Sequence, residues 1–147
     1  GRNGTPGQLA GFVQLGTENK LGDIRNNTSL GITGVISNEQ YQFQEDKSCA
    51  VGCKQDVKKG KASILCQLGD KVQEYEVEIE KINLSSEDNK GMEIHVTDPE
   101  LLKKAGGIVQ GMSGAPLLQD GKCIGAVTHV FVRDVTRGYA TFLENML

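Results

Sequence analysis

The chain has 147 residues, of which 37% are hydrophobic and 24% are charged, a composition typical of one globular domain with its own core. Its formal net charge of −3 excludes a nucleic-acid partner held by phosphate neutralisation, since such binding needs a basic surface. No run of about 18 apolar residues is present, so any membrane anchor is expected to lie outside this sequence.

Short runs rich in valine and isoleucine, separated by glycines, predict a mostly β fold. The longest run, "VQEYEVEIEKI", alternates Tyr75, Val77 and Ile79 with charged residues, which predicts one buried and one exposed face. The alternation slips at residues 73–74, where we expect a bulge, and Asp120-Gly121 predicts a tight hairpin turn. The strands expected in chain order are 10–14, 30–36, 62–68, 72–82, 91–96, 116–118, 122–132 and 139–142.

Helix signals are few. Asp98, Pro99 and Glu100 form the pattern of an N-cap, a first-position proline and an early acid, and the helix that they begin is expected to end at Gly106. A second short helix is expected at 144–147.

The four cysteines lack the close paired spacing of a zinc site, so the sequence predicts no metal site and no cofactor. Cys49 and Cys53 can form a disulfide in an oxidising compartment, or the thiols can remain free and buried.

The stretch "GGIVQGMSGAP", residues 106–116, places Ser113 between glycines. A serine becomes a nucleophile when a base takes its proton and donors receive the charge on the attacked carbonyl. The flanking glycines allow the amides of Gly111 and Ser113 to converge as an oxyanion hole, with Pro116 fixing the following chain. The alternative is a glycine-rich turn in which Ser113 bonds locally.

The segment "MEIHVTDPELLKKAGGIVQGMSGAPLLQDGKCIGAVTHVFVRDVTRGYATFLENML" closely resembles the catalytic region of the stage IV sporulation protein B peptidases of spore-forming bacteria. The segments "KLGDIRNNTSLGITGVI" and "DVKKGKASIL" resemble earlier parts of that family in the same order. The resemblance implies a trypsin-like fold, with two six-stranded β-barrels and the site between them. It also implies that Ser113 is the nucleophile and Asp98 the aspartate of the triad.

Two features depart from the family pattern. The family's base is a histidine in an upstream Gly-His segment that this sequence lacks, and Ala115 stands where relatives often carry serine. We therefore expect an N-terminally truncated or self-cleaved piece that is inactive alone. A second polypeptide is a possible source of the missing histidine.

Neither histidine in the chain is an obvious replacement. His95 is expected on the strand face opposite to Met92, Ile94 and Val96. His129 lies in the strand after the nucleophile's hairpin, where trypsin-like enzymes hold an extended substrate, so Val127, Thr128 and His129 are the predicted substrate-binding residues. A packed, non-functional histidine is the alternative there, and a helix cap is the alternative for Asp98.

By resemblance the whole protein is a serine endopeptidase exported to the space between forespore and mother cell. It would cleave a regulatory membrane protein and thereby activate a late sporulation sigma factor. A peptide-binding domain of the PDZ type and a membrane-anchoring segment would precede the present region. The alternative function is a non-catalytic peptide-binding or scaffolding module that keeps the trypsin-like groove.

Overall fold

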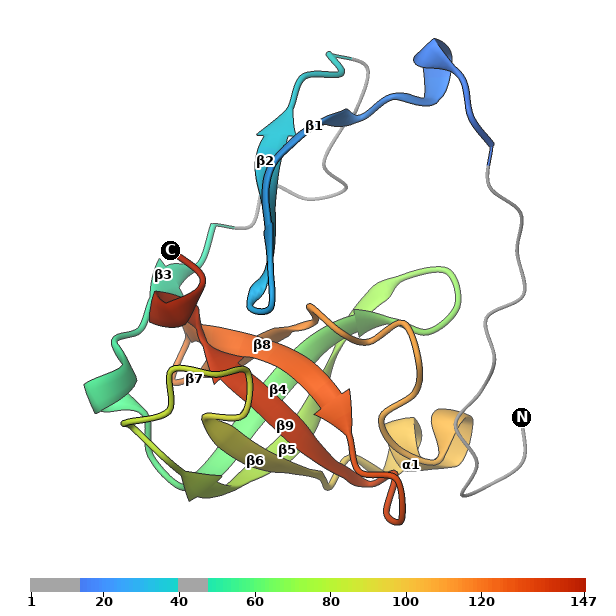
Figure 1. Cartoon of the computed structure of the whole chain (residues 1–147). Coiled ribbons are helices and arrows are strands. Elements are labelled where there is room, and N and C mark those ends of the chain that lie inside the picture. The colour runs from blue at the N-terminus through green and yellow to red at the C-terminus, as the bar shows by residue number, and fades with distance from the viewer. Residues whose placement is uncertain (1–13, 40–47) are drawn as a thin grey trace.

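A computed structural model of the chain describes residues 14–39 and 48–147 (Figure 1). In these described ranges one α-helix and three short 3-10 turns accompany the strands, so the mostly β fold class is confirmed. The strands are β1 (Gly22–Thr28), β2 (Gly31–Ile36), β3 (Ala50–Val51), β4 (Gly60–Gln67), β5 (Val72–Ile82), β6 (Met92–Val96), β7 (Pro116–Gln119), β8 (Lys122–Val130) and β9 (Arg137–Phe142). The helix is α1 (Pro99–Ala105), and the 3-10 turns are η1 (Thr17–Asn19), η2 (Lys54–Asp56) and η3 (Leu143–Asn145).

Six strands form a closed β-barrel in the spatial order β4-β5-β6-β9-β8-β7. Every neighbouring pair in this ring is antiparallel, and β7 closes it by pairing with β4 at Ser63↔Leu118 and Ile64↔Leu117. Closure leaves the ring without an open edge over the paired residues. This barrel is consistent with a trypsin-like barrel fold, and the described residues form one of the two barrels that the resemblance implies.

The barrel core follows from residue alternation. Tyr75, Val77 and Ile79 point inward from β5, while the charged residues between them face solvent or the rim. Met92 and Ile94 do the same on β6, and one cluster of buried apolar side chains fills the ring. The predicted burial pattern of the long strand is therefore correct.

The helix prediction is also confirmed. Asp98 is the N-cap of α1, Pro99 is its first residue, and Gly106 ends it in the left-handed conformation with φ 79°. The second predicted helix, at 144–147, is instead the 3-10 turn η3.

Several strand predictions differ from the structure. The predicted strand 10–14 falls almost entirely outside the described residues. The predicted bulge at residues 73–74 is wrong, because β4 and β5 pair without a register shift from Gly60↔Ile79 to Gln67↔Val72. The break in alternation there has another cause: Val72 begins β5 with an exposed side chain, so the core does not constrain it. The register shift in β5 lies between Ile79 and Lys81, where it pairs with β6.

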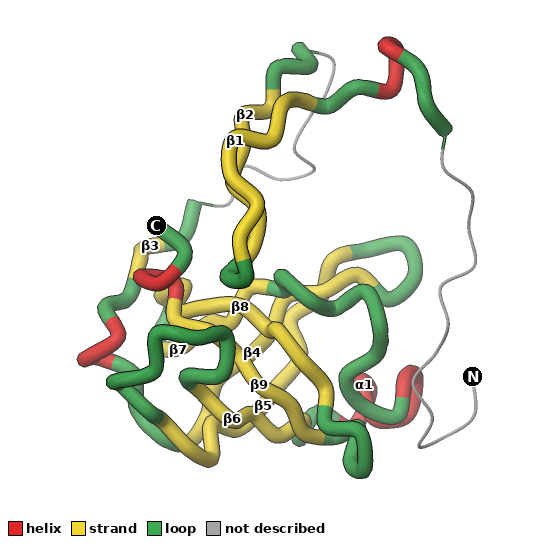
Figure 2. Tube along the Cα trace, viewed as in Figure 1, coloured by secondary structure: helices red, strands yellow, loops and turns green. Residues whose placement is uncertain are grey.

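Strands β1 and β2 form an antiparallel hairpin that stands apart from the barrel and directs its turn toward it (Figure 2). All residues of the two strands are exposed except the half-buried Gly22. Asn89 Nδ2, in the loop between β5 and β6, donates a hydrogen bond to the carbonyl of Ser29 in the turn, at 3.2 Å. Over the residues that the structure describes, no helix is long and apolar enough to cross a membrane.

Candidate active site

The loop that carries Ser113 runs from the end of α1 to the start of β7. Inside it, Met112 N donates to Val109 O at 3.1 Å and Ala115 N donates to Met112 O at 2.9 Å. Gly114 N donates to Val127 O at 2.8 Å, and Val127 N returns a bond to Ala115 O at 2.9 Å. These last two bonds fix the end of the loop to β8, beyond the point where β7 itself begins.

The beginning of the same loop packs against the connection between β8 and β9. Ile108 N donates to Val135 O at 2.7 Å. Gly107 has φ +142°, and a Cβ atom there would lie 2.2 Å from Val135 O. Only glycine fits this backbone conformation and this close approach, so both ends of the loop are held in place.

Ser113 is exposed, and its Oγ donates a hydrogen bond to the backbone carbonyl of Thr128 at 3.0 Å. Thr128 occupies a bulge, because Val127 pairs with Ala140 and His129 pairs with the next residue back, Tyr139. Bulges of this kind redirect backbone groups out of a strand ladder. Here the bulge coincides with the carbonyl that accepts the bond from Ser113.

The two amides predicted to form the oxyanion hole have no hydrogen-bond acceptor among the described residues. Gly111 has φ +101° and Gly114 has φ +88°, so both residues that flank the Met112-Ser113 pair use backbone conformations that favour glycine. Within the described part of the chain, the amides of Gly111 and Ser113 donate no hydrogen bond. Both amides are therefore available to a ligand.

One edge of β8 is open next to Ser113. The register with β7 ends at Ala126, and the loop adds bonds only to Val127. His129 and Val130 have described ladder partners on β9 alone, and the bulged Thr128 has no described ladder partner. Val127 differs from Thr128 and His129. Its side chain is buried in the core, and its amide and carbonyl are both hydrogen-bonded to the Ser113 loop.

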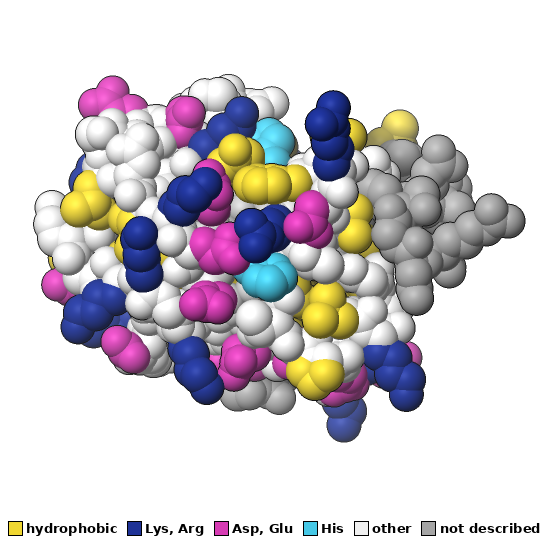
Figure 3. Space-filling model, turned by 90° about the horizontal axis from the view of Figure 1, so that it is seen from below, with side chains coloured by type: hydrophobic (Ala, Val, Ile, Leu, Met, Phe, Trp, Pro, Cys, Tyr) yellow, Lys and Arg dark blue, Asp and Glu magenta, His cyan; other side chains and the backbone are white. Residues whose placement is uncertain are grey.

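Neither histidine is hydrogen-bonded to Ser113. His129 is exposed, and its imidazole makes no hydrogen bond or ion pair with any described residue. His95 Nδ1 lies 3.5 Å from Glu80 Oε1, to which Arg137 Nη2 also pairs at 3.0 Å. Figure 3 shows a face on which histidine side chains lie among charged groups of both signs, with no patch of one sign.

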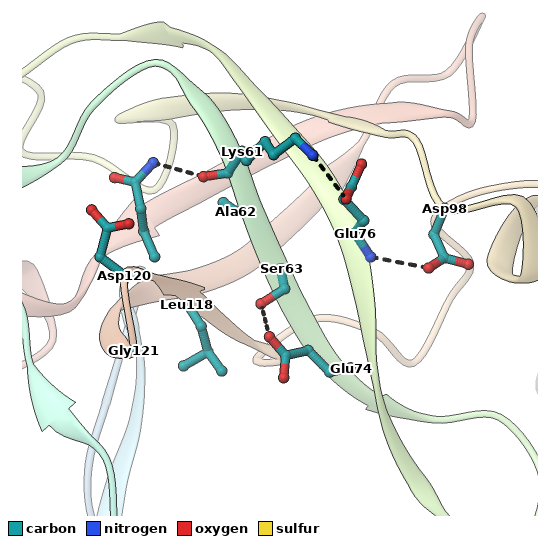
Figure 4. A pocket seen from close by; sticks show the side chains of 10 residues that line it. Lys61, Ala62, Ser63, Glu74, Glu76, Asp98, Leu118, Asp120 and Gly121 are labelled. Carbon is teal, nitrogen blue, oxygen red and sulfur yellow. Dashed lines mark hydrogen bonds and ion pairs between the residues drawn. The ribbon is translucent and has the colours of Figure 1, made fainter.

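Both oxygens of the Asp98 carboxylate accept hydrogen bonds from backbone amides. Oδ1 accepts hydrogen bonds from Glu100 N at 2.8 Å and Leu101 N at 2.9 Å, and Oδ2 accepts one from Glu76 N at 3.2 Å (Figure 4). Partial burial acts to raise the pKa of Asp98, but the bonds from Leu101, Glu76 and Glu100, with the nearby Lys104 charge, outweigh it and lower the pKa. The carboxylate is thus held ionised as a helix cap.

Asp98 also lines an open pocket of about 600 Å³ on the outer face of β4 and β5. Lys61, Glu74, Glu76 and Asp120 are among the other lining residues, and Ser113 is not. No hydrogen bond joins Asp98 to Ser113 or to either histidine among the described residues. The triad role of Asp98 stays a prediction.

Comparison with protein families identifies the chain. A family model described as SpoIVB peptidase S55 matches residues 1–147. The chain belongs to this family. No curated protein and no solved structure matches it. Membership implies a serine peptidase of the SpoIVB type, as the resemblance had indicated.

Over the described residues of this SpoIVB-type peptidase, no group of three histidine, cysteine, aspartate or glutamate side chains could hold a metal ion. All four cysteine thiols are free. Cys49 directly precedes β3 and Cys53 lies two residues after it, and the structure forms no disulfide between them.

The sequence did not predict the hydrogen-bonding roles of two residues near Ser113, Thr128 and Asn89. Thr128 was predicted to touch substrate, but its hydroxyl is turned toward Asn89 O at 2.6 Å and Tyr139 O at 3.1 Å. Asn89 was assigned only to a polar loop. Nothing in the local sequence predicts the contacts of the Thr128 hydroxyl, because Asn89 is 39 residues away in the chain and Tyr139 is 11 residues away.

Proposed function

We propose that Ser113 is the nucleophile of a serine endopeptidase. Its Oγ would attack the carbonyl carbon of a peptide bond while a histidine takes the hydroxyl proton. The C–N bond would then break as the histidine gives that proton to the leaving amine, and water would hydrolyse the acyl-serine. The observation that carries this proposal is an exposed serine hydroxyl fixed beside two unoccupied amides and an open strand edge.

The amides of Gly111 and Ser113 are proposed as the oxyanion hole. Such donors act where charge develops in the transition state, and each is worth about 10² to 10³ in rate in other enzymes. The anchoring of the loop at Ile108 and Gly114 supports this role, since donors must be fixed before the reaction to be effective.

The substrate is proposed to be an extended protein segment that pairs with β8. Strand addition needs a strand edge without a ladder partner, and beyond Val127 strand β8 has no described partner on the β7 side. The amide and carbonyl of Val127 are both bonded, so the proposed substrate-binding residues narrow to His129 and to Thr128, whose carbonyl also accepts from Ser113.

The general base in this proposal is a histidine that comes from a further segment or from a second polypeptide. His95 is engaged by Glu80, and His129 makes no bond to Ser113. Asp98 can orient such a histidine only through the remaining lone pairs of its carboxylate, in competition with its cap role.

Family membership supports the wider proposal that the enzyme acts during sporulation. In that proposal it works in the space between forespore and mother cell and cleaves a regulatory membrane protein. The cleavage would activate a late sporulation sigma factor.

A fluorophosphonate probe tests the proposal on the full-length gene product. The probe forms an Oγ–P bond with an activated serine and displaces fluoride. We expect wild type and the control Ser48→Ala, another exposed serine, to be labelled, and Ser113→Ala to remain at background. Equal labelling of Ser113→Ala would refute the assignment. A wild type that binds peptides without any labelling would support the non-catalytic module instead.

A further inference from the structure

Three hydrogen bonds link Ser113 to the hairpin β1–β2 through Thr128 and Asn89. Ser113 Oγ donates to Thr128 O at 3.0 Å, and Thr128 Oγ1 lies 2.6 Å from Asn89 O. Asn89 Nδ2 donates to Ser29 O, in the hairpin turn, at 3.2 Å. The hairpin turn, the loop between β5 and β6 and the end of β8 are therefore linked to Ser113, and Figures 1 and 2 show the hairpin directing its turn toward the barrel near β8.

Thr128 is the branch point of these hydrogen bonds. Its hydroxyl has one proton and two carbonyl neighbours, Asn89 O at 2.6 Å and Tyr139 O at 3.1 Å, so the shorter contact to Asn89 is the stronger one. Thr128 has no direct Cα partner on β9, because it is the bulged residue. Its side chain thus replaces the missing ladder contact and fixes the direction of its own carbonyl.

We propose that Thr128 and Asn89 are positioning residues that set the Ser113 hydroxyl and couple it to the β1–β2 hairpin. This inference rests on the proposed function of Ser113. Thr128 acts through its backbone carbonyl, which is too weak a base to take the proton but fixes Oγ in one orientation. Asn89 acts through Thr128, since its carbonyl accepts from that side chain and its amide group holds the hairpin turn.

The hairpin is suited to such coupling because it has few other constraints. Apart from the half-buried Gly22, its strand residues are exposed, and the two strands pair only with each other in the described chain. A shift of the turn would move Asn89, and through Thr128 it would move the carbonyl that Ser113 uses. Binding of another molecule to the hairpin is therefore expected to change the reactivity of Ser113 while the structure of the barrel stays the same.

The first test measures the fluorophosphonate inactivation rate of the full-length gene product. Thr128→Val keeps the β-branched shape and removes the hydroxyl, and we expect a loss of about 10- to 100-fold in the maximal labelling rate with unchanged probe affinity. Thr128→Ser keeps the hydroxyl and should restore the rate to within about threefold of wild type. A purely structural role would not give this rescue.

Thr141→Val is the matched control. Thr141 also donates its hydroxyl to a carbonyl of the same loop, Asp88 O at 3.4 Å, but lies outside the chain of bonds to Ser113. We expect its labelling rate to remain within about twofold of wild type.

The second test addresses the hairpin. Asn89→Ala removes the bond to Ser29 and leaves the backbone carbonyl for Thr128, so we expect a smaller loss of about fivefold. Asn145→Ala is its control, because Asn145 Nδ2 donates to Ser86 O of the same loop at the same 3.2 Å distance. That control should leave the labelling rate unchanged.

The outcomes separate this inference from the proposed function. Labelling that depends on Ser113 but is unaffected, or accelerated, in Thr128→Val and Asn89→Ala would overturn the positioning role alone. Labelling that does not depend on Ser113 would remove the proposed function as well. If Thr128→Val melts below the assay temperature, the half-buried loop residue Asn89 decides: an unchanged rate in Asn89→Ala overturns the coupling.

Discussion

The barrel buries its isoleucine side chains, whereas the β1–β2 hairpin leaves its isoleucine side chains exposed. Ile64, Ile79 and Ile94, in barrel strands, are 0% exposed. Ile24 and Ile32, in the hairpin, are 63% and 62% exposed. The same residue type in the same kind of strand therefore stabilises one region strongly and contributes little to the other.

This difference shows that the two regions are stabilised by different interactions. The barrel is closed and contains its own core, whereas an isolated two-stranded hairpin is at best marginally stable in water. The position of the hairpin depends on specific contacts such as the bond from Asn89 to Ser29. A region held in this way can move while the barrel that carries Ser113 stays intact.

The largest expected effect comes from a pair of identical substitutions in the two regions. Ile79→Ala should lower the free energy of unfolding by about 2 to 5 kcal/mol, because it removes buried methyl groups and leaves a cavity. Ile32→Ala should change it by less than about 0.5 kcal/mol. Urea unfolding followed by circular dichroism measures both. Equal losses would show that the hairpin is packed as firmly as the barrel.

Sequence reasoning succeeded where residues contact near neighbours. The alternation of Tyr75, Val77 and Ile79 predicted β5, and Asp98 and Gly106 predicted both ends of α1. It missed β1, whose "GDIRNNT" sequence lacks alternation because no core lies beneath it. It also missed β3, whose two residues are defined by parallel pairing with Lys122 and Cys123 rather than by any local pattern.

The candidate site shows the same division. The glycines around Ser113 predicted a tight loop, and the loop is present with positive φ values at Gly111 and Gly114. The bulge at Thr128 and its contact with Asn89 could not be predicted, since they depend on the registers of β8 and β9 and on a loop 39 residues away. The role of Asp98 as cap or triad acid is ambiguous in sequence because both need the same carboxylate.

A second, smaller effect concerns Asp98, at the start of the helix that leads from the barrel to the Ser113 loop. Asp98→Ala should destabilise the protein by about 1 kcal/mol, because Glu100 N and Leu101 N lose their acceptor. Asp98→Asn should be less destabilising at pH 7, because the asparagine oxygen can still cap Glu100 N and Leu101 N while the bond from Glu76 N is lost. Thermal unfolding measures both variants.

Fluorophosphonate labelling of Asp98→Asn then separates the two roles of this residue. A cap alone predicts a labelling rate within about twofold of wild type. A loss on the order of 10⁴-fold at unchanged stability would instead establish Asp98 as the orienting acid.

The same substitution has a pH dependence of known sign. The folded-state pKa of Asp98 is lowered, so its stabilising contribution is complete above the unfolded pKa and is lost as the pH falls through the folded pKa. Below about pH 4 wild type should therefore lose stability more steeply than Asp98→Asn. Identical slopes for the two proteins would show that the carboxylate gains nothing from the three amides.

The smallest effect leaves stability unchanged and compares thiols inside and outside the barrel ring. Cys66 lies in β4 and Cys123 in β8, and burial raises the pKa of both thiols, while Cys49 and Cys53 are exposed beside β3. Because the thiolate is the nucleophile, iodoacetamide at pH 7.5 should modify Cys49 and Cys53 about tenfold or more faster than the other two. Peptide mass spectrometry measures the rates, and the urea-unfolded protein, in which all four should react alike, is the control. Equally fast modification of Cys123 in the folded protein would mean that β8 opens readily, and the barrel would then be no more rigid than the hairpin beside it.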